Sequence, residues 1–133
     1  MRQALLCMAM LAALPAGVGA QDVSSDELST LVKGRTWHIA MQGELSHAGH
    51  STYWDFKPDG SVCARFGGAK PGDQCADEGR WRIDGQQLCW ELKLIGEQYG
   101  YKSVCAVVRK AGAHYEAHNV KGGFRQFVFR PVK

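Results

Sequence analysis

Residues 79–94 read GRWRIDGQQLCWELKL and constrain the fold more strongly than any other stretch of the chain. Hydrophobic and polar residues alternate on both sides of Asp84-Gly85, a dipeptide typical of a two-residue β-hairpin turn. This turn predicts three cross-strand pairs: Ile83 with Gln86, Trp81 with Leu88, and Gly79 with Trp90. One face of the hairpin is then hydrophobic (Trp81, Ile83, Leu88, Trp90, Leu92, Leu94), and the other carries Arg80, Arg82, Cys89, Glu91 and Lys93. We therefore predict a hairpin that buries one face.

The cysteines extend this hairpin to a third strand. Four of them follow residue 20, namely Cys63, Cys75, Cys89 and Cys105, and an even number in an exported chain predicts two disulfides. Opposed strand residues lie at a distance that a disulfide can bridge. If Cys89 lies opposite Cys105, Gly96-Glu97-Gln98 forms the tip, and Trp90 and Leu88 face Val104 and Ala106. We predict Cys89–Cys105 and, by elimination, Cys63–Cys75.

Two further turns complete the set of strands. Pro58-Asp59-Gly60 predicts Trp54 and Phe56 beside Val62, Ala64 and Phe66, and Lys121-Gly122-Gly123 predicts Tyr115 and Ala117 opposite Phe129 and Phe127. Ser24-x-x-Glu27 is a capping box that begins a short N-terminal helix ending near Gly34. The predicted strands are residues 35–43, 51–57, 61–66, 78–83, 86–95, 100–109, 113–119 and 124–131. This order is typical of an eight-stranded antiparallel up-and-down (lipocalin-like) barrel, with a two-sheet sandwich as the alternative.

The first 20 residues predict export. One arginine, a hydrophobic run and Val18-Gly19-Ala20 form a secretory signal peptide, which we expect to be cleaved after Ala20. Residues 21–133 then form a single periplasmic or secreted domain, and no second hydrophobic run approaches the roughly 20 residues that span a membrane. The 16 Lys and Arg residues, of which Arg2 leaves with the signal peptide, nearly balance the 13 Asp and Glu residues. This balance is not typical of a nucleic-acid-binding protein.

Large aromatic residues dominate the predicted interior. Trp37, Trp54, Trp81 and Trp90 all fall on the inward face, together with several phenylalanines. An eight-stranded barrel either is filled by its side chains or holds one small ligand. This many aromatic rings favour a filled core, and an open interior that carries a small ligand remains the alternative.

The outer surface offers two predicted binding features. Tyr53 opposite Arg65, together with the pair Arg80 and Arg82, forms a mildly basic surface for a partner. The loop Gly67–Asp77, closed by the predicted Cys63–Cys75 disulfide, is the best candidate for a rigid recognition element, since an ordered loop loses little entropy on binding.

Motifs for catalysis are not found in the sequence. It contains no nucleophile elbow, phosphate-binding loop or zinc-protease motif, and disulfide bonding occupies the mature cysteines, so we predict a protein that is not an enzyme and has no cofactor. His47-x-x-His50 in a polar loop is a weak candidate for a zinc or copper site. His114 and His118 lie on a predicted strand, about 13 Å apart, which is too far for one ion.

The combination of these motifs resembles a known group of proteins. Gly34-x-x-Trp37, Pro58-Asp59-Gly60 and the run from Gly79 to Trp90, with Cys105 as the cysteine partner, are similar to small exported bacterial β-proteins of unknown function. A weaker likeness is to the lipocalin-like periplasmic inhibitors of secreted metalloproteases. That likeness implies a disulfide-bonded barrel that inhibits a protein partner.

The functional prediction follows from these features together. We expect a non-enzymatic binding or inhibitory module that acts on a periplasmic or secreted protein and presents either Gln21–Ser25 or the loop Gly67–Asp77. The alternatives are a small-ligand carrier with an open barrel interior, or a periplasmic metal-handling protein that uses His47 and His50.

Overall fold

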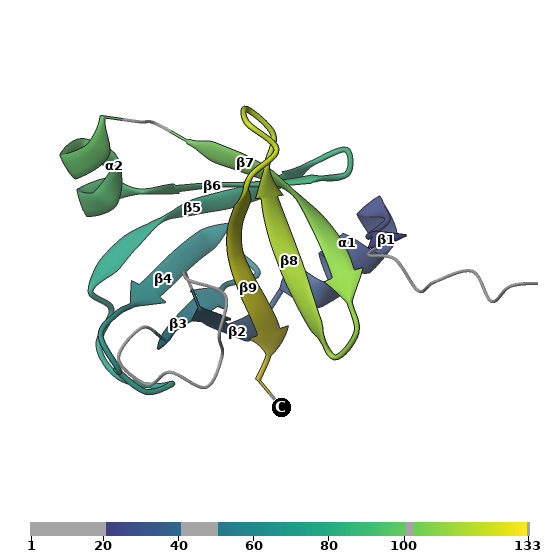
Figure 1. The fold of residues 1–133 in the computed structure, drawn as a ribbon. Coiled ribbons are helices and arrows are strands. Elements are labelled where there is room, and N and C mark those ends of the chain that lie inside the picture. The colour runs from purple at the N-terminus through teal and green to yellow at the C-terminus, as the bar shows by residue number, and fades with distance from the viewer. Residues whose placement is uncertain (1–20, 41–50, 101–102, 133) are drawn as a thin grey trace, which may run out of the picture.

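Eight antiparallel strands close into a barrel in the computed structural model, which describes residues 21–40, 51–100 and 103–132 (Figure 1). Each strand pairs with its sequence neighbours, and the first pairs with the last to close the barrel. The strands are β2 (Arg35–Ala40), β3 (Ser51–Phe56), β4 (Ser61–Arg65), β5 (Asp77–Asp84), β6 (Gln87–Leu92), β7 (Val104–Ala111), β8 (His114–Asn119) and β9 (Arg125–Pro131). The predicted up-and-down barrel is confirmed, and the two-sheet sandwich is wrong. The signal peptide and positions 41–43 of the first predicted strand lie outside the described residues.

The N-terminal segment is part of this fold. Gln21–Asp22 forms the short strand β1, which pairs with β7 at Lys110 and Arg109, beyond the residue at which β6 begins. Helix α1 (Ser25–Val32) follows, and the predicted capping box is present: the Ser24 hydroxyl accepts from the Glu27 backbone N–H, and the Glu27 carboxylate accepts from the Ser24 backbone N–H. Sequence reasoning found α1 and missed β1, because a two-residue strand carries no periodicity.

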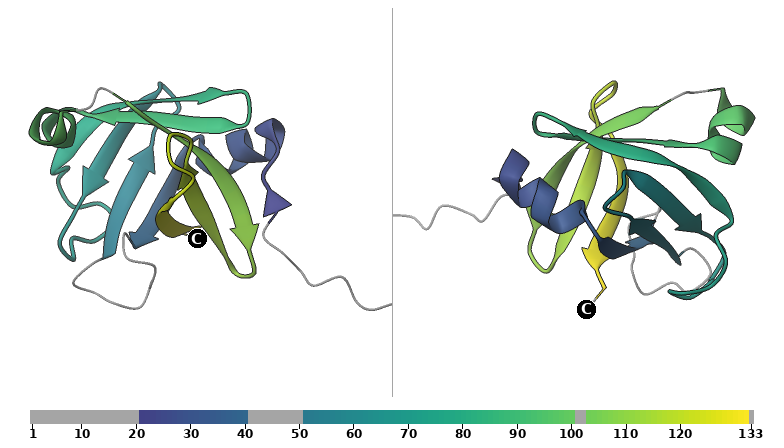
Figure 2. Two further views of the ribbon diagram at one scale, coloured as in Figure 1. Left: turned by 45° about the horizontal axis from the view of Figure 1, so that its top comes forward. Right: turned by 180° about the vertical axis from the view of Figure 1, so that it is seen from behind.

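The two helices lie at opposite ends of the barrel. Figure 2 shows α1 at one end and the second helix, α2 (Lys93–Tyr99), at the other. Leu28 and Val32 of α1 are fully buried against the barrel, and the Trp37 indole N–H donates to the Leu31 carbonyl at 2.9 Å. Helix α1 therefore covers one end of the hydrophobic interior.

Contacts between aromatic rings fill the barrel interior. The Trp37 ring stacks on Phe129, with centroids 3.6 Å apart, and Trp54 contacts Trp90 edge-on at 6.0 Å. Three of the four tryptophans are almost fully buried, and Trp81 is half-buried at the edge of the core. Phe127 packs against both Trp54 and Trp90, so the rings form one continuous cluster. Burial of this much hydrophobic surface is the main favourable term in folding the domain.

The hairpin registers test the sequence patterns most directly. The pairs predicted around the Pro58 and Lys121 turns and for Cys89 with Cys105 are confirmed, and both disulfides form as predicted. The pairs predicted around Asp84-Gly85 are wrong: the loop is Gly85-Gln86, and Trp81 lies opposite Trp90 rather than Leu88. Gly85 adopts φ +60° and Gln86 does not have a positive φ, which is typical of a type II′ turn with glycine at its first central position. Because this register differs by two residues, the side chains within β5 and β6 keep their predicted faces.

Helix α2 replaces the tip predicted between the two cysteine-bearing strands. Strand β6 ends at Leu92, and Leu94, predicted to lie in the core, is 55% exposed on α2. The cause lies elsewhere in the chain. Asp77, which the sequence placed at the end of the loop Gly67–Asp77, is 4% exposed, and its carboxylate accepts the backbone N–H groups of Leu94 and Ile95 at 3.0 and 2.9 Å. These bonds cap α2, whose preceding residue, Leu92, has no side-chain acceptor.

Gly79 permits a close approach of two strands beside this cap. A Cβ atom at position 79 would overlap the backbone carbonyl of Glu91 on β6. Glycine is therefore required here by the spacing of β5 and β6, because it has no Cβ.

Candidate functional site

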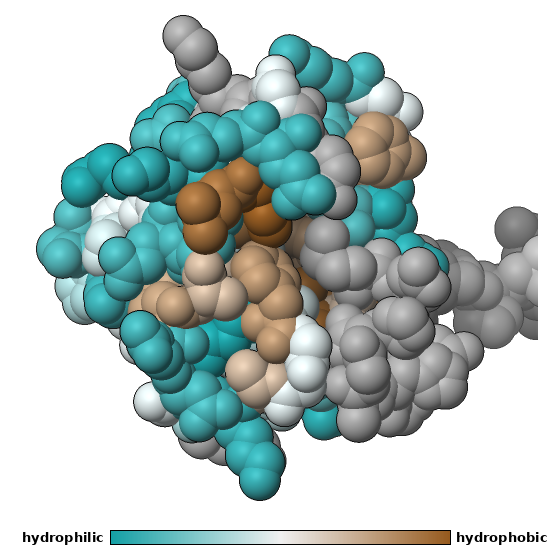
Figure 3. All heavy atoms as spheres, turned by 90° about the vertical axis from the view of Figure 1, so that its left-hand side faces the viewer, coloured by the Kyte–Doolittle hydropathy of each residue, from teal (hydrophilic) through white to brown (hydrophobic). Residues whose placement is uncertain are grey.

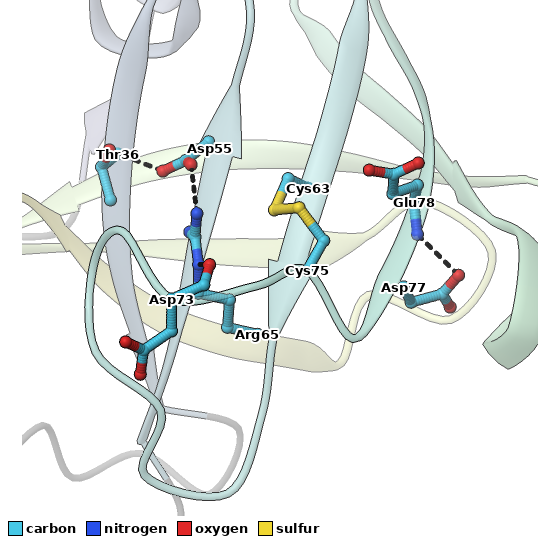
Figure 4. Close-up of a disulfide and its surroundings, with 8 residues drawn as sticks. All are labelled: Thr36, Asp55, Cys63, Arg65, Asp73, Cys75, Asp77 and Glu78. Atoms are coloured by element: carbon cyan, nitrogen blue, oxygen red, sulfur yellow. Dashed lines mark hydrogen bonds and ion pairs between the residues drawn. A yellow bond between two sulfur atoms is a disulfide. The ribbon is translucent and has the colours of Figure 1, made fainter.

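The loop between β4 and β5, residues 66–76, is held to the barrel wall by a disulfide, and we call it the disulfide loop. Cys63 on β4 bonds to Cys75 across a Cα–Cα distance of 5.4 Å (Figure 4). Within the loop, Asp73 donates its backbone N–H to the Lys70 carbonyl and accepts the Lys70 N–H on its carboxylate. Most of the loop is nevertheless exposed to solvent, namely Gly67, Gly68, Lys70, Pro71, Gly72, Asp73, Gln74 and Ala76. The loop is thus both ordered and accessible.

Arg65 fixes the loop from beneath. Its side chain is only 6% exposed, its Nε donates to the Asp73 carbonyl, and its Nη2 donates to Asp55 at 2.8 Å. Burial alone raises the pKa of Asp55, but hydrogen bonds from Arg65 and Thr36 outweigh it and lower the pKa below its usual range. Asp55 is therefore a stable carboxylate that holds the guanidinium in place. Arg65 anchors the disulfide loop and does not face solvent.

Four adjacent strands place one row of side chains on the outer face of the barrel. The register aligns Arg130 of β9 with His38 of β2, His38 with Tyr53 of β3, and Tyr53 with Arg65 of β4. The His38 and Tyr53 rings stack, with centroids 4.8 Å apart. His38 is only 7% exposed, and burial together with the positive charge of Arg130 lowers its pKa, so the imidazole is neutral at neutral pH. Arg130 is exposed at the far end of the row.

Two clefts share a wall with the disulfide loop. The first, of about 350 Å³, we call the Arg130 cleft, and it is lined by His38, Tyr53, Pro71, Arg130, Pro131 and Val132. The second, of about 560 Å³, we call the Leu94 cleft, and it is lined by residues 73–78 of the chain together with Lys93 and Leu94 of α2. Figure 3 views the side of the molecule on which α2 lies and shows hydrophobic residues gathered at its centre, with hydrophilic residues around them.

The predicted binding residues separate into two places. Tyr53 and Arg65 belong to the row beside the disulfide loop, as the cross-strand pairing predicted. Arg80 and Arg82 are exposed on β5, where Arg80 pairs with Ser61 at the opposite end of β4 from Arg65. Four residues along a strand span about 13 Å, so the structure does not join the two pairs into one surface.

The remaining predicted elements lie elsewhere. His47 and His50 fall outside the described residues. The segment Gln21–Ser25 is built into the fold, since Val23 is 4% exposed and donates its backbone N–H to the Val108 carbonyl, and Asp22 pairs with Arg109 at 2.8 Å. This segment is therefore not a free N-terminal arm.

Sequence reasoning included Pro71, as part of the loop Gly67–Asp77, but missed His38 and Arg130. His38 lies in the first predicted strand, residues 35–43, but nothing local connects it with a residue 92 positions later. The pairing of β2 with β9 brings His38 and Arg130 together, and that pairing exists only once the barrel closes. They could have been found from the sequence only by closing the predicted barrel in a specific register between its first and last strands.

A second group of titratable side chains lies on the outer face of β8. The Glu116 carboxylate contacts His118 at 2.9 Å and Arg125 at 3.3 Å, and the hydrogen bond from His118, followed by that from Arg125, lowers the pKa of Glu116. His114 lies 4.0 Å from the same carboxylate. In the part of the chain that the structure describes, no group of three His, Cys, Asp or Glu side chains is arranged to hold a metal ion.

The arrangement beside the disulfide loop combines an exposed guanidinium, an aromatic stack and two prolines, and the cysteines of the loop are joined in a disulfide. No protein-family profile, curated protein or solved structure matches the chain. Across the described ranges, no helix is long and hydrophobic enough to span a membrane.

Proposed function

We propose that this protein is a non-enzymatic binding module of the periplasm or the extracellular space, and that it recognises a protein partner with the disulfide loop and its flanking clefts. One observation carries the proposal. An exposed loop is fixed to the barrel both by Cys63–Cys75 and by the buried Arg65. A loop that is ordered before binding loses less conformational entropy on association, so its contacts contribute more fully to affinity.

The interior of the barrel supports a surface role over ligand carriage. Inside the barrel, Trp37 packs on Phe129. Trp54 and Trp90 both pack on Phe127. A carrier of this fold needs space where these rings lie. The disulfide loop is also a better recognition element than Gln21–Ser25, because β1 pairs with β7 and Val23 is buried, so that this segment is part of the fold. Two disulfides fit an exported protein, which is the compartment that the predicted signal peptide implies.

Site-specific photo-cross-linking tests the proposal. A photo-reactive amino acid replaces the exposed Gln74 of the loop in one variant and the exposed Gln86 in a control. Gln86 lies in the turn at the other end of β5. Irradiation in the native host should yield an adduct of defined mass from position 74 and none from position 86. No adduct at position 74, or the same adduct at both positions, would refute the proposed function.

The two disulfides provide a matched pair of perturbations. Cys63→Ser with Cys75→Ser releases the loop, whereas Cys89→Ser with Cys105→Ser removes a disulfide between β6 and β7. We expect the first variant to lose the Gln74 adduct and the second to retain it, with tryptophan fluorescence used to verify that both barrels are folded. Equal effects of the two variants on the adduct would contradict a role for loop preorganisation.

A further inference from the structure

We propose that the Arg130 cleft binds a carboxylate and an adjacent hydrophobic side chain of the protein partner, so that the recognised segment is an acidic peptide. This inference rests on the proposed function and specifies the chemistry of its partner. It assigns the carboxylate to the guanidinium of Arg130 and the hydrophobic side chain to the stacked rings of His38 and Tyr53.

The charge of the cleft supports this assignment. Arg130 is the one charged residue among the six that line the Arg130 cleft, and it is exposed. No carboxylate within the described residues forms an ion pair with it, whereas the nearby Asp55 is occupied by Arg65 and Thr36. A guanidinium offers a planar pair of N–H donors that matches a carboxylate, and such charge-assisted bonds are stronger than neutral ones.

The uncharged lining supports a hydrophobic neighbour. His38 is neutral because burial and Arg130 lower its pKa, and its ring is stacked on Tyr53. The half-buried Tyr53 therefore presents an aromatic surface beside a single cation, and the buried His38 ring supports it from below. Aromatic rings supply a large, rigid contact area for a hydrophobic side chain at low entropic cost.

Pro71, Pro131 and Val132 complete the lining of the cleft. Pro71 lies in the disulfide loop, and Pro131 ends β9 opposite Trp37. The next residue, Val132, donates its backbone N–H to the Thr36 carbonyl at 2.8 Å, which keeps the chain against β2 beyond the end of the strand. The lining is thus in place before a ligand arrives.

The second cleft has the opposite charge and helps to direct an acidic segment. Asp73, Asp77 and Glu78 line the Leu94 cleft, with Lys93 as its cation. A carboxylate that approaches the disulfide loop is therefore repelled on one side and attracted on the other. Such complementarity sets the orientation of a partner as well as its rate of association.

A nuclear magnetic resonance titration tests the chemistry directly. The oxidised exported domain, labelled with ¹⁵N, is titrated with N-acetylphenylalanine and, in parallel, with N-acetylphenylalanine amide. The two probes share the hydrophobic group, and only the first has a carboxylate. We expect shifts at Tyr53 and Arg130 with the acid, and at least about tenfold weaker binding of the amide, as loss of one charge-assisted hydrogen bond implies.

Arginine variants localise the effect. Arg130→Gln should abolish the preference for the acid, Arg130→Lys should retain part of it, and Arg82→Gln, at another exposed arginine on β5, should leave it unchanged. Equal affinity for acid and amide, shifts centred away from Tyr53 and Arg130, or a preference that survives Arg130→Gln would overturn the inference. An adduct at Gln74 that Arg130→Gln leaves unchanged would refute this inference alone, whereas absence of that adduct refutes the proposed function itself.

Discussion

Replacing Asp77 with alanine should destabilise the domain by about 2–4 kcal/mol. Its carboxylate accepts three backbone N–H groups, those of Glu78, Leu94 and Ile95, at distances of 2.8–3.0 Å. Loss of a helix N-cap costs about 0.5–2 kcal/mol, and each donor left unpaired in a buried site costs about 1–3 kcal/mol. Water can reach part of this site because Leu94 is exposed, which places the total below the sum of these contributions.

Equilibrium unfolding in urea with both disulfides intact measures this effect through tryptophan fluorescence. Asp77→Asn keeps one acceptor oxygen and should lose about half as much stability, while Asp84→Ala, at an exposed strand end, should change the free energy of unfolding by less than about 0.5 kcal/mol. Hydrogen exchange adds a local readout, since the amides of Leu94 and Ile95 should exchange faster in Asp77→Ala. A variant as stable as the parent, with unchanged exchange at these amides, would refute the assignment of Asp77 as the cap of α2.

Three further outcomes follow from the structure. Gly79→Ala should lower the free energy of unfolding by about 1–3 kcal/mol, because its Cβ displaces the Glu91 carbonyl, and a thermal melt that matches the parent would contradict this. Asp55→Asn should reduce the loss of stability in acid. Because the pKa of Asp55 is lowered, its carboxylate stabilises the fold above the ordinary carboxyl pKa, and this stabilisation is lost as the pH falls through the lowered value. The free energies of unfolding of variant and parent, measured in urea from about pH 7 to about pH 3, should therefore converge at the acid end. Cys89→Ser with Cys105→Ser should cost about 3 kcal/mol in urea unfolding, as expected for a disulfide that closes a loop of 16 residues, and reduction of the parent, which also breaks Cys63–Cys75, should cost more.

Patterns within a hairpin could be predicted, and contacts between distant segments could not. Alternation, turn residues and cysteine spacing are local, and they specified the eight strands, the Cys89–Cys105 register and both disulfides. Even where the turn at Gly85 was misplaced, the two-residue period preserved the buried face.

Only part of the candidate site could be predicted from the sequence, for the same reason. Tyr53 and Arg65 face each other across one short turn, so their pairing could be predicted. Their neighbours His38 and Arg130 depend on closure of the barrel. The environment of Asp77 was predicted wrongly because its hydrogen-bond partners lie 17 and 18 residues away, in a helix where the hydrophobic alternation predicted a strand.

The pairing that closes the barrel also determines the order in which this chain can fold. Strand β2 is synthesised near the beginning of the domain and β9 at its end, yet the two must pair along Trp37–Ala40 and Val128–Pro131. Until that happens, β2 has an unpaired edge, which is the kind of surface that aggregates with other chains. The hairpins join neighbouring segments of the chain, so their contacts can form before β2 meets β9. We expect the pairing of these two strands to be the slow step of folding, and the edge of β2 to be open to other chains until that step is complete.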